Sequence, residues 1–156
     1  MNKVLTESKA TAIGYARYGD EYLFAAKAVD LTLGEKPGYE IVSPMPAYFL
    51  AAHAIELLLK SYLLQCGYSD VILRNKFRHD LERLFSEAKQ HGLCGALLSN
   101  SQSEELILLL AELNKYEAMR YMKRGEKEFP IWGSIQNFIE ELRSTVLLKV
   151  GYTSVL

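Results

Sequence analysis

The chain has 156 residues, of which 49% are hydrophobic, and a formal net charge of −1. This length and composition predict one domain, residues 1–156, with a substantial hydrophobic core. So small a net charge excludes a global positive field, and any contact with RNA requires a local basic patch. Cys66 and Cys94 have neither metal-site nor disulfide-framework spacing, and we expect two buried free thiols in a reducing compartment.

The sequence indicates a cytoplasmic protein without a membrane segment. No signal peptide is evident at the start of the chain. The longest apolar run, residues 47–64, is interrupted by three polar residues and is not a convincing span. Phosphate loops, dinucleotide fingerprints, zinc spacings and nucleophile elbows do not occur in the sequence, so we expect neither a cofactor nor a metal.

The first predicted helix covers about residues 6–33. Its apolar and aromatic residues recur at steps of three and four and predict one stripe along the helix: Tyr15, Tyr18, Tyr22, Ala25 and Val29. Gly34 follows the last of these positions as a stop signal, and residues 34–43 are predicted to form a loop.

The second predicted helix begins with Ser43 as its cap and Pro44 in its first turn, and it extends to about Cys66. Gly67 is expected to end it. This helix is apolar on most faces, which is typical of the central, most buried helix of a bundle.

Three further helices are predicted after a connection over residues 68–78. One covers about residues 79–91, another about residues 101–123 behind a capping box formed by Ser101 and Glu104, and the last begins near Ser134. Their expected buried residues are Leu81, Leu84, Phe85 and Ala88, then Leu106, Leu109, Leu110, Leu113 and Tyr116, then Ile135, Phe138, Ile139, Leu142 and Val146. The fold class is therefore all-α, a bundle of about five helices.

Three polar residues of the second helix, His53, Glu56 and Lys60, fall on one face because they are three and four positions apart. Burying such groups is costly unless they are paired. One interpretation is a polar cluster that lines a ligand or RNA groove. The other is structural: Glu56 pairs with Lys60 and also meets Arg120 or Tyr116.

Several segments of this chain together resemble the HEPN superfamily. They are the stretch around Glu56 and Lys60, then Arg78, His79, Asp80 and Leu81, then Asn114, Lys115 and Tyr116 with Arg120 and Tyr121. The resemblance implies an up-and-down helical domain that commonly dimerises, occurs in toxin–antitoxin and defence operons, and binds or acts on RNA or nucleotides.

Catalytic members of that superfamily are metal-independent ribonucleases with an arginine, four to six intervening residues and a histidine. Arg74 and His79 satisfy this spacing with four residues between them. The position usually expected for the motif corresponds better to the segment that begins at Arg120, which contains no histidine. In the catalytic hypothesis, histidine moves the 2′-hydroxyl proton and arginine stabilises the phosphate.

Two alternatives stay open for the remaining candidate residues. His79 and Asp80 either cap and pack the start of the third helix or contact phosphate. Tyr116, Arg120 and Tyr121 belong either to a basic-aromatic RNA surface over residues 115–127 or to a solvated face diluted by glutamates.

The function predicted first is a homodimeric HEPN-like binding or partner module associated with RNA or a nucleotide. A metal-independent ribonuclease that uses Arg74 and His79 is the second hypothesis. The third is a structural interaction domain whose partner is another protein, such as a nucleotidyltransferase. If the protein dimerises, we expect exposed apolar area on the first or last helix.

Overall fold

The computed structural model describes residues 9–115, 119–122 and 124–156. Every regular element in these ranges is a helix, which confirms the all-α fold class. The long helices are α1 (Ala12–Leu33), α2 (Met45–Gln65), α4 (Leu81–Gln90), α5 (Ser101–Lys115) and α6 (Trp132–Val150). A short α3 (Asp70–Ile72) and a π-helix, η1 (Leu73–Phe77), connect α2 to α4.

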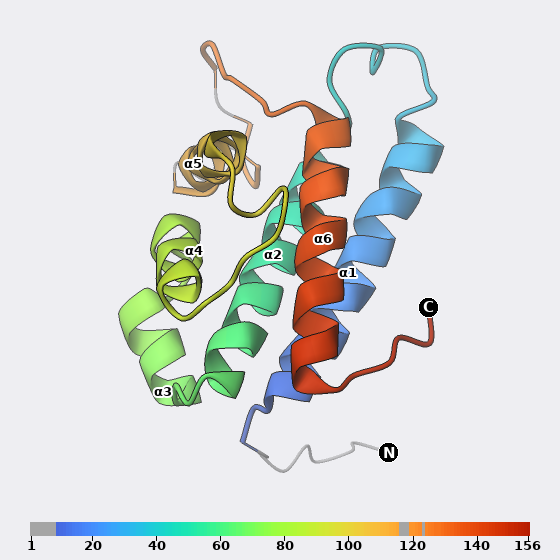
Figure 1. Ribbon diagram of the computed structural model, residues 1–156. Coiled ribbons are helices and arrows are strands. Elements are labelled where there is room, and N and C mark those ends of the chain that lie inside the picture. The colour runs from blue at the N-terminus through green and yellow to red at the C-terminus, as the bar shows by residue number, and fades with distance from the viewer. Residues whose placement is uncertain (1–8, 116–118, 123) are drawn as a thin grey trace, which may run out of the picture.

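Three long helices lie side by side, with α1 antiparallel to α2 and α6 (Figure 1). The other two, α4 and α5, pack against α2 on the side away from α1, and α5 crosses the long helices steeply (Figure 1). The described part of the molecule shares a single hydrophobic core around α2. Most residues of α2 are buried, as its apolar sequence predicts.

The start of α2 differs from the prediction. Its N-cap is Pro44, without a side-chain cap, and Pro46 occupies the first turn. A proline is tolerated there because the first-turn amides have no intrahelical acceptor. Among the described residues, α2 alone has the length and apolar composition of a membrane span, and most of it is buried inside the bundle.

The predicted tyrosine stripe lies at the border of the buried face of α1, and its Tyr22 packs against the core. The buried residues of α1 are Ala16, Gly19, Asp20, Leu23 and Ala26, whereas Tyr18 is 57% exposed. Small residues let the α1 backbone approach α2 closely: a Cβ added at Gly19 would lie 2.8 Å from Leu58 Cγ. Periodicity of the large apolar residues therefore did not point to the small residues that are buried deepest.

The predicted connection after α2 is largely helical. The Ser69 side chain caps α3 by accepting a hydrogen bond from the Ile72 amide at 3.3 Å. In η1, the Arg78 amide donates to Leu73 O at 2.9 Å, and Leu73 and Phe77 are buried. Arg78 then has a φ of 54°, unusual for a residue with a side chain. This turn places His79 immediately before α4.

The expected buried faces of α4 and α6 are confirmed in full. In α5, Leu106, Leu110 and Leu113 are buried and Leu109 is partly exposed, while Tyr116 lies outside the described residues. Ile107, which the prediction omitted, is also buried.

Two other predictions about this half of the chain are wrong. Asn100, rather than Ser101, caps α5 by accepting from the Ser103 amide at 2.9 Å, and Glu104 instead pairs with Lys89. Residues 119–122 are not helical, so α5 does not continue to residue 123. The thiols also differ from expectation, because Cys66 is half-buried and Cys94 is exposed.

Candidate functional site

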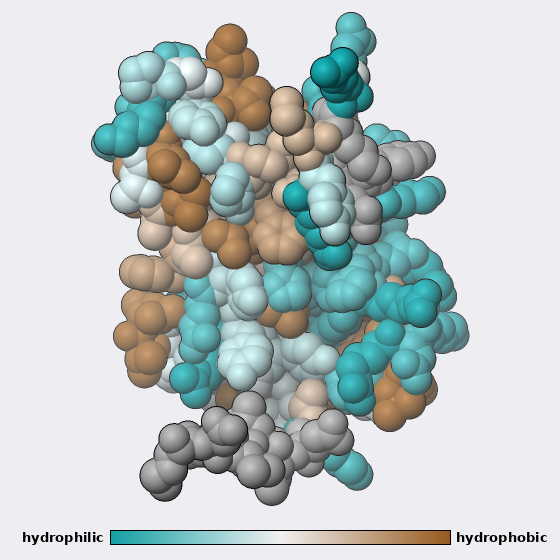
Figure 2. Space-filling model, turned by 180° about the vertical axis from the view of Figure 1, so that it is seen from behind, coloured by the Kyte–Doolittle hydropathy of each residue, from teal (hydrophilic) through white to brown (hydrophobic). Residues whose placement is uncertain are grey.

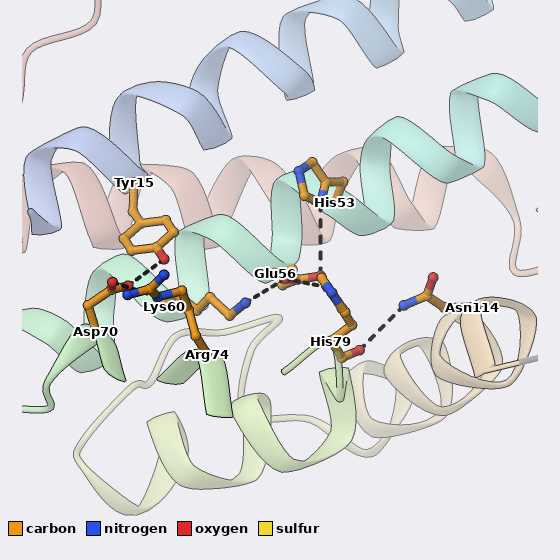
Figure 3. Close-up of polar contacts among 8 residues, drawn as sticks. All are labelled: Tyr15, His53, Glu56, Lys60, Asp70, Arg74, His79 and Asn114. Carbon is orange, nitrogen blue, oxygen red and sulfur yellow. Dashed lines mark hydrogen bonds and ion pairs between the residues drawn. The ribbon is translucent and has the colours of Figure 1, made fainter. Parts of the chain in front are cut away.

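The buried carboxylate of Glu56 is the centre of a polar network on α2. Glu56 is only 3% exposed. Lys60 Nζ donates to Glu56 Oε1 at 2.6 Å, and the His79 Nδ1 atom lies 2.9 and 3.0 Å from the two carboxylate oxygens (Figure 3). His53 Nδ1 is 3.9 Å from Oε2. Burial alone would raise the pKa of this carboxyl group, but the contacts with His53, Lys60 and His79 outweigh burial and lower the pKa to about 2.

These contacts show where the predicted cluster residues lie. The expected pairing of Glu56 with Lys60 is confirmed, and Lys60 is itself only 5% exposed. The further expected partners were Arg120 and Tyr116. Arg120 instead lies over the Phe49 ring, 5.6 Å from its centroid, and Tyr116 lies outside the described residues. His79 takes the place that the prediction gave to Arg120.

His79 is held by its backbone and by one ring nitrogen. Asn114 Nδ2, on α5, donates to the His79 carbonyl at 3.3 Å (Figure 3). The side chain is 64% exposed, and no hydrogen bond joins Nε2 to any described residue. A carboxylate that accepts from Nδ1–H fixes the tautomer in which Nε2 carries the lone pair. The arrangement can therefore orient Nε2 for a ligand or for proton transfer.

A cleft of about 420 Å³ adjoins this histidine, between the start of α4 and the end of α5. Its lining residues are His79, Asp80, Leu81, Glu82, Ala111, Asn114, Lys115 and Arg120. One carboxylate oxygen of Asp80 already accepts a hydrogen bond, because this side chain caps α4 by accepting from the Arg83 amide at 3.1 Å. This cap agrees with the structural interpretation of Asp80. Arg120 and His79 bring cationic and imidazole groups to the same cleft.

Arg74, the other residue of the catalytic hypothesis, belongs to a different cluster. Its Nε is 2.8 Å from Asp70 Oδ2, and the Tyr15 hydroxyl donates to Asp70 Oδ1 at 2.7 Å. Burial and this hydrogen bond raise the Tyr15 pKa. Figure 3 shows Tyr15, Asp70 and Arg74 as one group of contacts, with His79 in the separate group around Glu56. Arg74 and His79 thus bind two separate carboxylates.

Some partners were not predicted from the sequence. Tyr22 packs edge-on against His53 with ring centroids 4.5 Å apart, and the Phe49 ring is parallel to His53 at 6.5 Å. No local signal links Tyr22 to His53, because they belong to different helices. The pairing of Asp70 with Arg74 had a local signal, the spacing of four residues on a helix.

The remaining predicted residue, Tyr121, is 61% exposed. In the ranges that the structure describes, no group of three or more histidine, cysteine or acidic side chains could hold a metal ion. Searches of known family models, curated proteins and solved structures found nothing that matches this chain.

Proposed function

We propose that the protein is a HEPN-like module that binds RNA or a nucleotide in the cleft beside His79. The observation that carries this proposal is the contact between Glu56 and His79, in which a buried carboxylate orients an exposed imidazole toward a site shared with Arg120. Holding an ionised carboxylate inside a bundle is costly. Its use to orient a surface side chain favours a binding role for that side chain.

The chemistry of the cleft favours a phosphate-bearing ligand. Its volume, about 420 Å³, falls within the range of small-molecule sites. The Arg120 guanidinium supplies the fork of donors that suits phosphate oxygens, and it already lies over the Phe49 ring. Guanidinium planes and aromatic rings are the groups on which unpaired bases stack. Asp80 and Glu82 oppose an anion at the α4 side of the cleft, which favours a ligand that reaches the cleft from the Arg120 side.

A metal-independent ribonuclease is the second candidate, and the same contact supports it. With Nδ1 held by Glu56, the Nε2 atom of His79 could accept the 2′-hydroxyl proton of RNA, while an arginine stabilises the charged phosphate. In the original hypothesis that arginine is Arg74, which pairs with Asp70. Arg120 lines the cleft with His79 and is the better placed of the two.

The decisive experiment separates binding from cleavage. Fluorescently labelled RNA is incubated with wild-type protein in EDTA, and both affinity and cleavage are measured, with His79→Gln and Arg120→Gln as test variants. Glutamine at position 79 retains an amide donor for Glu56, and circular dichroism checks that each variant keeps the fold. Arg74→Gln is the matched control for Arg120→Gln.

Binding without cleavage that weakens in the His79→Gln and Arg120→Gln variants supports the binding module. Cleavage lost in both variants but kept in Arg74→Gln supports the ribonuclease with Arg120 in place of Arg74. If wild-type protein neither binds nor cleaves the RNA, both the RNA-binding and the ribonuclease proposals are contradicted. A protein partner, such as a nucleotidyltransferase, would then be the remaining hypothesis.

We further propose that the protein acts as a homodimer in the cytoplasm, within a toxin–antitoxin or defence setting. The exposed apolar area that dimerisation requires is present on α1, where Ile13, Phe24 and Leu31 are 49%, 57% and 65% exposed. Sedimentation equilibrium tests this proposal directly. A mass equal to one chain across the accessible concentration range would contradict it.

A further inference from the structure

Three cationic residues lie close together in the chain where η1 meets α4, and we call Lys76, Arg78 and Arg83 the basic ridge. All three residues are exposed. Lys76 Nζ and Arg83 Cζ lie 5.9 and 5.2 Å from the centroid of the buried Phe77 ring. One aromatic ring therefore gathers two of the three cations.

Within the described part of the chain, no carboxylate forms an ion pair with Lys76, Arg78 or Arg83. Of the neighbouring acidic side chains, Asp70 pairs with Arg74, whereas Asp80 caps α4 by accepting from a neutral amide and keeps its negative charge. Glu82 lines the cleft. Like charges held close together repel one another, and an anion bound between them removes that cost. The ridge thus carries three cations, and the neighbouring Asp80 and Glu82 offset only part of that positive charge, on a chain whose net charge is −1.

A backbone carbonyl holds one of these side chains in place, that of Arg83. Arg83 Nη1 donates to the Lys76 carbonyl at 3.0 Å, which ties α4 to the π-helix. Arg78 lies between the two at the positive-φ turn, directly before His79. Hydrophilic side chains gather over this side of the molecule, at the right of Figure 2. The basic ridge thus flanks in sequence the residues of α4's start that line the cleft, from His79 to Glu82.

We propose that the basic ridge binds the phosphate backbone of the RNA whose reactive or recognised nucleotide occupies the cleft. This inference rests on the proposed function and specifies its ligand: an RNA strand several nucleotides long rather than a free mononucleotide. The ridge supplies point charges and guanidinium forks, which contact phosphate independently of base sequence. The cleft holds one nucleotide beside His79, and the strand continues over Lys76, Arg78 and Arg83.

The test measures the affinity for a fluorescent single-stranded RNA of about 20 nucleotides while the salt concentration is raised from about 50 mM. The salt dependence counts phosphate contacts, because each neutralised phosphate in a single strand contributes about −0.7 to the slope of log K against log salt. The test variant is Lys76→Gln/Arg83→Gln. Lys36→Gln is the control, since Lys36 is exposed in the α1–α2 loop at the opposite end of the bundle (Figure 1). Arg83→Lys restores charge without the guanidinium fork.

We expect the double variant to bind roughly tenfold or more weakly at low salt, with a slope shallower by about 1.4. Lys36→Gln should bind as wild type does. The single variant Arg83→Lys should keep most of the wild-type slope. Because loss of the Arg83 contact could loosen η1, the fold is checked by circular dichroism, and Lys76→Gln alone should still reduce the slope by about 0.7.

The failures of the two proposals are distinguishable. If wild-type protein binds the RNA and the ridge variants keep its affinity and slope, the ridge inference is overturned while the cleft proposal stands. Two control ligands test the assignment to an RNA backbone. That assignment is overturned if a mononucleotide, or a polyglutamate of equal charge, binds as tightly as the RNA. If wild-type protein binds a mononucleotide but no RNA, the ridge inference fails while the cleft proposal stands. If it binds neither, the proposed function fails and the ridge inference fails with it.

Discussion

Glu56 retains its charge inside the bundle because three side chains converge on it. An ion removed from water costs several kcal/mol, and the cost is recovered only through close partners and satisfied hydrogen bonds. Lys60 is as deeply buried as Glu56, so each of these two residues depends on the other. His79 adds a contact from the surface. The contact between Glu56 and His79 therefore fixes α2 and the turn before α4 with respect to each other.

We expect Glu56→Gln to lower the free energy of unfolding by about 3–5 kcal/mol, because it leaves the Lys60 ammonium buried without a counter-charge. Adding Lys60→Met should recover part of this loss. Glu21→Gln, which removes the exposed partner of Arg17, should change stability by less than about 0.5 kcal/mol. Urea denaturation measures all three. Equal losses in the single and double variants would contradict the dependence of Lys60 on Glu56.

Acid should also destabilise the protein through Glu56. Its pKa is about 2 in the folded protein, against an ordinary value of 4.5, so the unfolded chain binds a proton first as pH falls. The stabilisation, roughly 3 kcal/mol by this difference, is complete above about pH 4.5 and is lost as pH falls toward 2. Denaturation across this range should show a steeper loss for wild type than for Glu56→Gln. Parallel curves would contradict the prediction.

Among the helices, α1 and α2 are joined by a seam of small residues. The close approach at Gly19 depends on the missing side chain, since its nearest neighbour is the fully buried Leu58. Packed interiors rarely yield space for even one methyl group. The seam thus explains why the small residues of α1, rather than its tyrosines, are buried deepest.

We expect Gly19→Ala to lower the free energy of unfolding by about 1–3 kcal/mol, because the added Cβ would displace Leu58. Gly133→Ala is the matched control. Position 133 lies in the first turn of α6 with no atom within 4 Å of an added Cβ, and the gain in helix propensity there should stabilise the fold by up to about 1 kcal/mol. Thermal unfolding of the two variants should shift in opposite directions. A stabilising Gly19→Ala would overturn the close-packing argument.

Across the whole molecule, the C-terminal residues are tied back to the first helix. Asp20, on α1, is 3% exposed and accepts hydrogen bonds from Arg143 on α6 and from the Ser154 hydroxyl. Lys27 and Glu140 form a second link between the same two helices. These contacts bring together segments more than 100 positions apart and close the layer of long helices around α2.

We expect Ser154→Ala to lower the free energy of unfolding by about 1–2 kcal/mol, because it removes a hydrogen bond to a buried carboxylate. For a chain of this size, each kcal/mol corresponds to about 2–4 °C in melting temperature. Thr153→Ala, at the exposed neighbouring position, should leave the melting temperature unchanged. Equal shifts in the two variants would show that the Ser154 contact contributes nothing specific.

The sequence was sufficient for the helical class, for the buried faces of α4 and α6, and for the shared face of His53, Glu56 and Lys60. Helical periodicity is a local property, so it appears in the sequence directly. The choice of partners was settled by packing: His79 reaches Glu56 across 23 positions, and α1 buries small residues because α2 lies so close. Contacts between distant elements depend on how helices pack, and no periodic pattern encodes them.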